Sequence, residues 1–426
     1  MNAAAAALPP RAGLAYGALG LPLAFLALPL YVSLPQHYAQ NHGVPLALLG
    51  LVLLLTRSAD ALLDPLIGQG VDRLFGRSLG AVRGLALLAG LVLGLGFAAL
   101  FFPPWTDYAS SPAPLLAWLV LSLVFTYLAF SALSVLHQAW GTRLGGDAPL
   151  RARVVAWREG FGLVGVLLAS VLPTLVGLPW STGILLLTLA LGLAMLLRAA
   201  PRPARIAGSD DARAGAWRAP LGNKPFRGLL AVFMANGIAS AVPATLLVFF
   251  VQDRLQDAAG LPLYLFAYFL AAALSVPLWL RLVGRLGLSH AWLLGMGLAV
   301  LAFAGALALP AGARGGFLAV CLASGVALGA DLALPGALLT GLVQRAGHGA
   351  LSGAYAGWWT AASKLNLGLA AGAALPLLAL AGYTPGARAP EALQALGLAY
   401  VALPCALKLL AAALLWRWAR SPGAEP

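Results

Sequence analysis

The stretch Thr56-Arg57-Ser58-Ala59-Asp60-Ala61-Leu62-Leu63-Asp64-Pro65 places one arginine and two aspartates inside a run otherwise built of Leu, Val and Ala. Asp60 and Asp64 are one helical turn apart and Arg57 precedes Asp60 by three residues, so all three project from one face of a helix. A charge at the centre of a bilayer costs about 2.5–3.5 kcal/mol, and such residues persist where they line a path for ions or protons. An Arg57–Asp60 pair that ties two helices together is the structural alternative.

The composition excludes an ordinary soluble domain. Of 426 residues, 61% are hydrophobic and 9% are charged, whereas a soluble domain has about 25% charged residues. The net charge of +13 does not indicate nucleic acid, because the basic residues lie in short loops between apolar segments and form no patch with interleaved aromatics. The sequence therefore predicts an integral membrane protein whose surroundings are the lipid bilayer.

No motif for enzymatic chemistry is visible. Cys321 and Cys405 both fall within apolar segments, which argues against a disulfide framework and against a metal site with the usual Cys/His spacing. The sequence has no Walker motif, G-x-S-x-G or H-E-x-x-H, so we expect no enzyme, no metal and no cofactor. The segment 1–10 has no basic region before the first apolar run, and we expect no cleaved signal peptide.

Apolar stretches of about 20 residues or more predict an all-α membrane protein with twelve transmembrane helices. Strands of a membrane barrel would instead read as alternating segments of about ten residues. The predicted spans lie near 12–37, 45–70, 79–102, 114–141, 153–177, 181–199, 226–251, 260–284, 289–309, 316–342, 350–381 and 392–418.

Loop charges predict the orientation. Twenty of the 26 Lys and Arg residues lie on one set of alternate loops and three on the other, which places both termini in the cytoplasm. A polar loop with several Pro and Gly residues, 200–225, is predicted to be a cytoplasmic linker. It separates a six-helix bundle over 1–199 from a second over 226–426, and this layout resembles the major facilitator fold.

The loop after the second span carries a further motif. Gly-Gln-Gly-Val-Asp-Arg-Leu-Phe-Gly-Arg over 68–77 resembles the G-x-x-x-D-R-x-G-R signature of major facilitator transporters, with one extra residue before the second Gly. The resemblance implies a cytoplasmic gate formed by Asp72, Arg73 and Arg77, in which Asp72 pairs with a base in one transport state. An exposed turn with unpaired charges is the alternative.

Two longer matches point to one family. Arg57-Ser-Ala-Asp60-Ala-Leu-Leu-Asp64-Pro65 fits R-x-x-D-A-x-x-D-P-x-x-G of the glycoside-pentoside-hexuronide:cation symporters, the family of the melibiose carrier. The aromatic stretch 353–365, which ends in Lys364-Leu365, resembles the family's eleventh span. Shorter matches at Tyr16, Tyr127, Arg158 and Asp331 follow the family's order along nearly the whole chain.

The resemblance implies roles for these residues. Asp60 and Asp64 would bind the coupling cation, and Lys364 would reach them from the other half, with Arg57 and Arg158 completing a charge network. Two carboxylates one turn apart repel, so they tend to hold a proton or share a cation. The substrate cavity would be lined by Tyr16, Tyr127, Ser131, Asp331, Tyr355, Trp358, Trp359 and Thr360.

Departures from the family change the expected substrate and ion. Where sugar-carrying members have two aspartates and a tryptophan, this chain has Ala24, Ser131 and Val135, so we expect a solute less polar than a disaccharide. Leu63 and Leu128 stand where the family has sodium ligands. A proton needs only one carboxylate in an apolar setting, so we favour a proton over sodium as coupling ion.

Several polar residues have less certain roles in the sequence. We interpret His37, His42 and His137 as polar residues near helix ends rather than proton relays. Asp331 can either titrate or satisfy backbone groups freed by Pro335, and both interpretations stay open. Lys408 lies near the middle of the twelfth span with no partner that the sequence identifies.

The sequence thus predicts a symporter of a bacterial inner membrane that moves a small organic solute with a cation by alternating access, as a monomer. Two alternatives remain: a transporter of lysolipids or similar amphiphiles with the same fold, and a membrane scaffold or receptor that does not transport.

Overall fold

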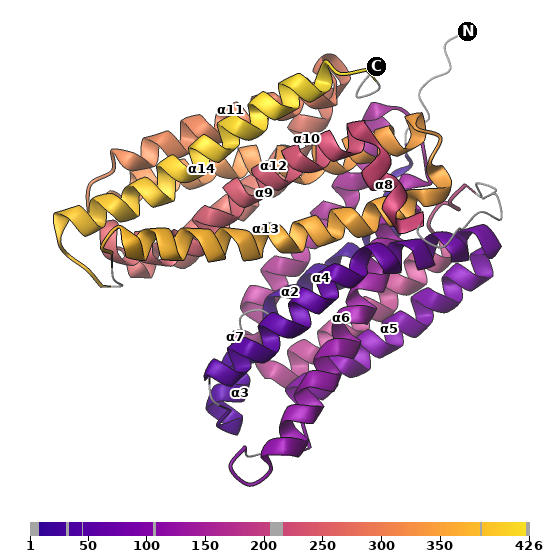
Figure 1. The fold of residues 1–426 in the computed structure, drawn as a ribbon, viewed down its shortest axis with the longest axis horizontal. Coiled ribbons are helices and arrows are strands. Elements are labelled where there is room, and N and C mark those ends of the chain that lie inside the picture. Colours follow the sequence, from indigo (N-terminus) through magenta and orange to yellow (C-terminus); the bar gives the residue numbers. More distant parts are fainter. Residues whose placement is uncertain are drawn as a thin grey trace. The chain divides into compact units, whose positions relative to one another are not determined.

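The computed structural model describes residues 8–30, 34–44, 46–104, 108–204, 216–383 and 386–422. Within these residues the chain is helical and contains no strand (Figure 1). The helices are α1 (Pro10–Gly17), α2 (Gly20–Leu28), α3 (Leu34–His42), α4 (Leu46–Arg77), α5 (Leu79–Phe101), α6 (Pro112–Thr142), α7 (Ala148–Arg198), α8 (Ala219–Gly222), α9 (Lys224–Phe249), α10 (Leu261–Leu286), α11 (Leu288–Leu307), α12 (Arg314–Arg345), α13 (Ser352–Leu380) and α14 (Pro390–Ala419).

These helices correspond closely to the predicted spans. Among the described residues, eight helices are long and apolar enough to cross a membrane. The helix α7 runs through two predicted spans and breaks at Gly177, whose φ of 78° and ψ of 167° suit glycine. The first predicted span is described as α1, α2 and α3, and residues 31–33 within it lie outside the described part.

The structure divides into two compact units. The N-terminal unit comprises 1–146, 156–220 and 347–361, and the C-terminal unit comprises 147–155, 221–346 and 362–426. The first ten residues of α13 therefore pack with the N-terminal unit, whereas the rest of this helix packs with the C-terminal unit. The domain boundaries expected from the sequence, at the 200–225 linker, stay a prediction.

In the N-terminal unit, α4 and the start of α13 touch through glycines. A Cβ atom built on Gly68 would lie 2.0 Å from the carbonyl oxygen of Gly353, and one on Gly353 would lie 2.3 Å from the carbonyl oxygen of Gly68. One turn further along, a Cβ atom on Gly357 would lie 2.3 Å from the carbonyl oxygen of Asp64. Because these helices approach through their backbones, no larger residue fits at the contact.

Asp72 holds the N-terminus of α13 against α4. Its Oδ1 accepts hydrogen bonds from the Gly353 amide at 2.6 Å and from Arg143 Nη2 at 3.0 Å, and its Oδ2 accepts one from the Ala354 amide at 2.8 Å. The first amides of a helix have no partner within that helix. The carboxylate of Asp72, which belongs to α4, therefore caps α13 with favourable charge at the positive end of the helix dipole.

Arg143 completes this arrangement. The same Nη2 that pairs with Asp72 donates to the carbonyl oxygen of Ala350 at 3.2 Å, and the guanidinium lies 4.1 Å from the ring centroid of Phe75. The side chains of Arg143 and Asp72 are 2% and 7% exposed, so the ion pair is shielded from water. The segment before α13 is thus fixed to α4 and α6 by one buried pair.

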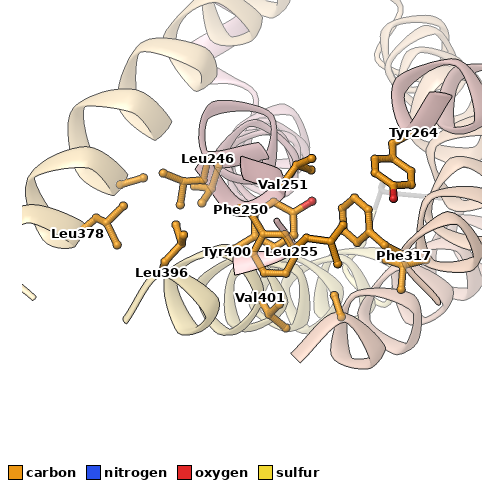
Figure 2. Packing of buried hydrophobic residues seen from close by; sticks show 14 of the residues in the cluster. Leu246, Phe250, Val251, Leu255, Tyr264, Phe317, Leu378, Leu396, Tyr400 and Val401 are labelled. Atoms are coloured by element: carbon orange, nitrogen blue, oxygen red, sulfur yellow. The ribbon is translucent and has the colours of Figure 1, made fainter. Parts of the chain in front are cut away.

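The C-terminal unit contains a hydrophobic core of aliphatic and aromatic side chains (Figure 2). The helix α12 packs between α10 and α11, while α14 packs against α9 and α11. Phe250 stacks on Tyr400 with ring centroids 4.1 Å apart, and Tyr264 meets Phe317 edge to face at 4.8 Å. Such aromatic pairs contribute about 0.5–1.5 kcal/mol each beyond the area they bury.

We expect Gly68→Ala to destabilise the protein by about 1–3 kcal/mol, because the added methyl group collides with the Gly353 backbone. Gly70→Ala is the matched control, since nothing lies within 4 Å of a methyl group at that position of the same helix. Thermal unfolding in detergent measures both variants. Equal midpoints for the two would contradict the close helix contact.

Asp72→Asn should show a pH-dependent effect on stability. Burial raises the pKa of Asp72 from 3.8 to about 6, and this outweighs Arg143 and the two amides, which lower it. The folded wild-type chain therefore binds this proton more tightly than the unfolded chain, and it loses stability as pH rises from 4 to 6.

The Asn variant has no such titration. Its melting temperature relative to the wild type should rise between pH 4 and pH 6 and level off above. Thermal scans in one detergent at several pH values measure this difference. A difference in melting temperature that stays constant from pH 4 to pH 6 would show that burial does not raise the pKa of Asp72.

Candidate functional site

The two aspartates of the 56–65 segment, Asp60 and Asp64, lie in the interior of the N-terminal unit. Asp60 is 5% exposed and Asp64 is fully buried. The hydroxyl of Ser131, on α6, donates a hydrogen bond of 2.7 Å to Oδ1 of Asp60. Pro65 lies inside α4 directly after the second aspartate and is itself buried. The sequence therefore places two buried carboxyl groups one turn apart at the point where α4 meets α6 and α13.

Ser131 has a role that the sequence did not reveal. The resemblance places this position in the lining of the substrate cavity, where sugar-carrying members of the family have an aspartate. In the structure its hydroxyl is directed to Asp60, so it stabilises a carboxylate. A hydroxyl 71 positions away in the sequence carries no local signal of such a contact.

A second polar group joins α1 to α6. The hydroxyl of Tyr16 donates to the carbonyl oxygen of His137 at 3.1 Å, and Nε2 of His137 lies 2.8 Å from the carbonyl oxygen of Tyr16. Nearby, Arg158 pairs with Glu159 at 2.6 Å and also interacts with the Tyr16 side chain. The sequence indicated only a polar residue near the end of a helix. In the structure His137 is buried and links α6 to α1.

The aromatic residues of α13 lie in the part of this helix that packs with the N-terminal unit. The Tyr355 hydroxyl is 2.7 Å from Nδ1 of His348, and Trp358 Nε1 donates to the carbonyl oxygen of Trp217 at 2.8 Å. Trp359 is buried, as is Tyr127 of α6, and Thr360 is half-buried. These contacts fix the aromatic side chains, and a role in lining a substrate cavity stays a prediction.

The remaining charged residues of the predicted site differ in exposure. Arg57 is half-buried, whereas Arg73 and Arg77 are exposed at the end of α4. Lys364 is half-buried in the part of α13 that packs with the C-terminal unit. Its predicted approach to Asp60 and Asp64 therefore stays a prediction.

The C-terminal unit contains a buried ion pair that the sequence did not identify. Lys408 Nζ lies 2.6 Å from Oδ2 of Asp331, and the two side chains are 8% and 12% exposed. Asp331 Oδ1 also accepts hydrogen bonds from Asn236 Nδ2 at 3.1 Å and from Trp292 Nε1 at 2.8 Å. One signal could have found this pair, because Asp331 and Lys408 both lie near the middle of their predicted spans.

This ion pair adjoins a cavity of about 120 Å³ lined by α9, α10, α11, α12 and α14. Asp331, which the resemblance placed in a substrate cavity, lines this one together with Lys408 and Ser240. Among the described residues, no three His, Cys, Asp or Glu side chains gather as a metal site requires.

The comparisons with known proteins identify the family. A family model described as MFS/sugar transport protein, where MFS is the major facilitator superfamily, matches residues 13–419. No curated protein sequence matches.

Solved structures show the same fold. A bacterial homologue of the iron transporter ferroportin, in an outward-facing state, has a TM-score of 0.73 and 17% identity, over 96% of this chain and 99% of that one. The Escherichia coli fucose:proton symporter has a TM-score of 0.63 and 15% identity, over 94% and 98%. A proton:xylose symporter has a TM-score of 0.63 and 15% identity, over 96% and 94%.

These structures share the twelve-helix fold of two domains, which confirms the fold class expected from the sequence. The family consists of transporters, not enzymes. The family match covers nearly the whole chain, and the structural matches agree with it. This multi-pass membrane protein therefore belongs to the MFS/sugar transport family of the major facilitator superfamily.

Proposed function

We propose that this protein is a cation-coupled symporter that moves an organic solute by alternating access, with Asp60 and Asp64 as the cation site. The observation that carries the proposal is the burial of both carboxyl groups one turn apart in α4. Two ionised carboxylates in a buried site repel each other and are costly, so one of them tends to take a proton or both share a cation. Loading and unloading such a site can bias a transporter between its two states.

A proton is favoured over sodium as the coupling ion. Sodium needs several oxygen ligands, but Leu63, which stands at a family ligand position, is apolar and exposed. The Ser131 hydroxyl adds one oxygen beside Asp60, and a proton needs no more than the carboxylate itself. Two of the solved structures with this fold are proton-coupled symporters of fucose and xylose, which supports the same choice.

The solute should be less polar than a disaccharide. Ser131 is engaged with Asp60, and Ala24 and Val135 offer no hydrogen bonds to a sugar from their side chains. A lysolipid or similar amphiphile remains the alternative substrate. We expect the protein to lie in a bacterial inner membrane, and the distribution of loop charges supports an orientation with both termini in the cytoplasm. We expect it to act as a monomer.

Asp60→Asn and Asp64→Asn should each lower gradient-driven uptake at least 10-fold while the protein remains folded. The substrate is first selected by a thermal-shift screen of sugars, organic acids and lysolipids. Uptake is then measured in proteoliposomes with an imposed proton gradient and, separately, with a sodium gradient at clamped pH. Asp147→Asn is the matched control, because this exposed side chain accepts from the Leu150 amide at the start of α7, and Asn can do the same.

Uptake that follows sodium and ignores the proton gradient would overturn proton coupling. Unchanged uptake in the double variant Asp60→Asn/Asp64→Asn would overturn the cation site. The absence of gradient-driven uptake of any solute that the wild type binds would favour the scaffold alternative.

Ser131→Ala should lower gradient-driven uptake, because it removes the hydroxyl that donates to Asp60 and leaves this buried carboxyl group with one donor fewer. One hydrogen bond contributes about 0.5–1.5 kcal/mol, which corresponds to a loss of about 2- to 10-fold. Ser122→Ala, a change at a buried serine on the same helix, is the control and should leave uptake as in the wild type. Uptake in Ser131→Ala that equals that of the control would contradict the role assigned to this hydroxyl.

A further inference from the structure

The cavity of the C-terminal unit is mainly apolar and aromatic. Tyr268 and Phe269 of α10, Phe303 of α11 and Tyr400 of α14 line it. Its volume of about 120 Å³ is comparable to cavities of about 150 Å³ that bind one benzene molecule. The cavity therefore suits a small apolar body such as a single aromatic ring.

One charged side chain of this cavity has unused donor capacity. Lys408 has three N–H donors, and two of them bind Asp331 Oδ2 at 2.6 Å and Ser240 Oγ at 3.0 Å. Within the described residues its third donor has no partner. An ammonium group beside an apolar cavity is a ready partner for an anionic group on a ligand.

Asp331, in contrast, already accepts from several donors. Asn236 and Trp292 donate to Oδ1, while Lys408 and, at 3.5 Å, Ser240 donate to Oδ2. A cationic ligand would have to displace Lys408 to reach this carboxylate. The arrangement thus favours a ligand that accepts hydrogen bonds over one that donates them.

The net charge of the Asp331–Lys408 site limits how an anion can bind in the cavity. The Asp331–Lys408 pair is neutral, so an added anion alone would leave one net negative charge in a buried site, at a cost of several kcal/mol. If Asp331 takes up a proton from water at the same time, Lys408 pairs with the anion and the site stays neutral. The anion and the proton are therefore expected to bind together.

The other groups around the cavity do not change this balance. Besides Asp331 and Lys408, the titratable groups that line it are tyrosines and cysteines, which are neutral at physiological pH. The helix α13 contacts α9 where Asn366 meets Gly237, and its one cation, Lys364, does not line the cavity. The lining titratable groups are Tyr264 and Tyr268 of α10, Cys321 of α12, and Tyr400 and Cys405 of α14.

We infer that this cavity binds a small organic monoanion with an apolar body, held by Lys408, and that one proton is taken up on Asp331 with each anion. This assignment names a substrate class and a second proton site for the symporter proposed above, and in that sense it rests on the proposed function. It differs from the Asp60 and Asp64 site because all its residues belong to the C-terminal unit.

The test uses the full chain in lipid nanodiscs and isothermal titration calorimetry. Three probes share one phenyl body: 3-phenylpropionate, its neutral amide and 3-phenylpropylamine. We expect the carboxylate to bind at least 10-fold more tightly than the amide or the amine. Titrations in two buffers with different ionisation enthalpies should give an uptake of about one proton per carboxylate bound.

Variants separate the two roles. Lys408→Met should lower the affinity for the carboxylate at least 10-fold and leave that for the amide unchanged. Asp331→Asn should keep carboxylate binding and reduce the proton uptake to about zero. Lys224→Met, which removes an exposed lysine at the start of α9, is the control and should match the wild type.

The double variant Asp331→Asn/Lys408→Met tests the role of Lys408 in case a single replacement prevents folding. Removing one partner of a buried pair leaves an uncompensated charge, whereas replacing both partners is often tolerated. The double variant should fold, bind the amide and lose its preference for the carboxylate. A wild-type preference for the carboxylate that persists in this variant would overturn the role of Lys408.

Three further results would overturn the inference: equal affinity for all three probes, binding of none of them at millimolar concentration, or carboxylate binding without proton uptake. Because binding is measured without a gradient, the two proposals fail separately. Proton-coupled anion binding can hold while the Asp60 and Asp64 variants transport normally, and gradient-driven uptake of another solute can hold while no anion binds here.

Discussion

The free-energy cost of placing a charge in a medium of low dielectric constant determines how the buried carboxyl groups of this protein are arranged. Of the aspartates described above, Asp60 lies beside a hydroxyl, Asp72 beside an arginine and two helix amides, and Asp331 beside a lysine. Each arrangement supplies donors that replace water. Since these groups come from other helices in every case, the polar contacts also determine which helices pack together.

The three carboxyl groups are stabilised to different degrees, and this separates their roles. Asp72 is held by an ion pair and by the N-terminus of α13, an arrangement that joins segments far apart in the sequence and suits a structural latch. Asp331 is paired with a fixed internal cation, so a ligand anion can compete for Lys408. Asp60 accepts a hydrogen bond from the Ser131 hydroxyl, a neutral donor on α6, and the proposed role of this carboxyl group is to bind the coupling cation.

Much of the fold follows from the sequence because hydrophobic length has few interpretations in a bilayer. The break at Gly177 falls at the last residue of the fifth predicted span, and α9 to α14 begin and end close to the predicted limits. The burial of Asp60 and Asp64 could also be anticipated, since both lie within an apolar run and one turn apart. The sequence placed Asp331 and Lys408 each near the middle of a span, but it did not pair them, because residues 77 positions apart share no periodic signal.

The sequence by itself determined the membrane class, the helical fold, the family resemblance and the location of the paired aspartates, because these depend on local composition, spacing and motif. Tertiary structure alone decided that Ser131 donates a hydrogen bond to Asp60 and that Asp72 caps α13. It also decided that Lys408 forms an ion pair with Asp331 beside an apolar cavity. Partners of buried charges are chosen by how helices pack in three dimensions, and no spacing along the chain encodes that choice.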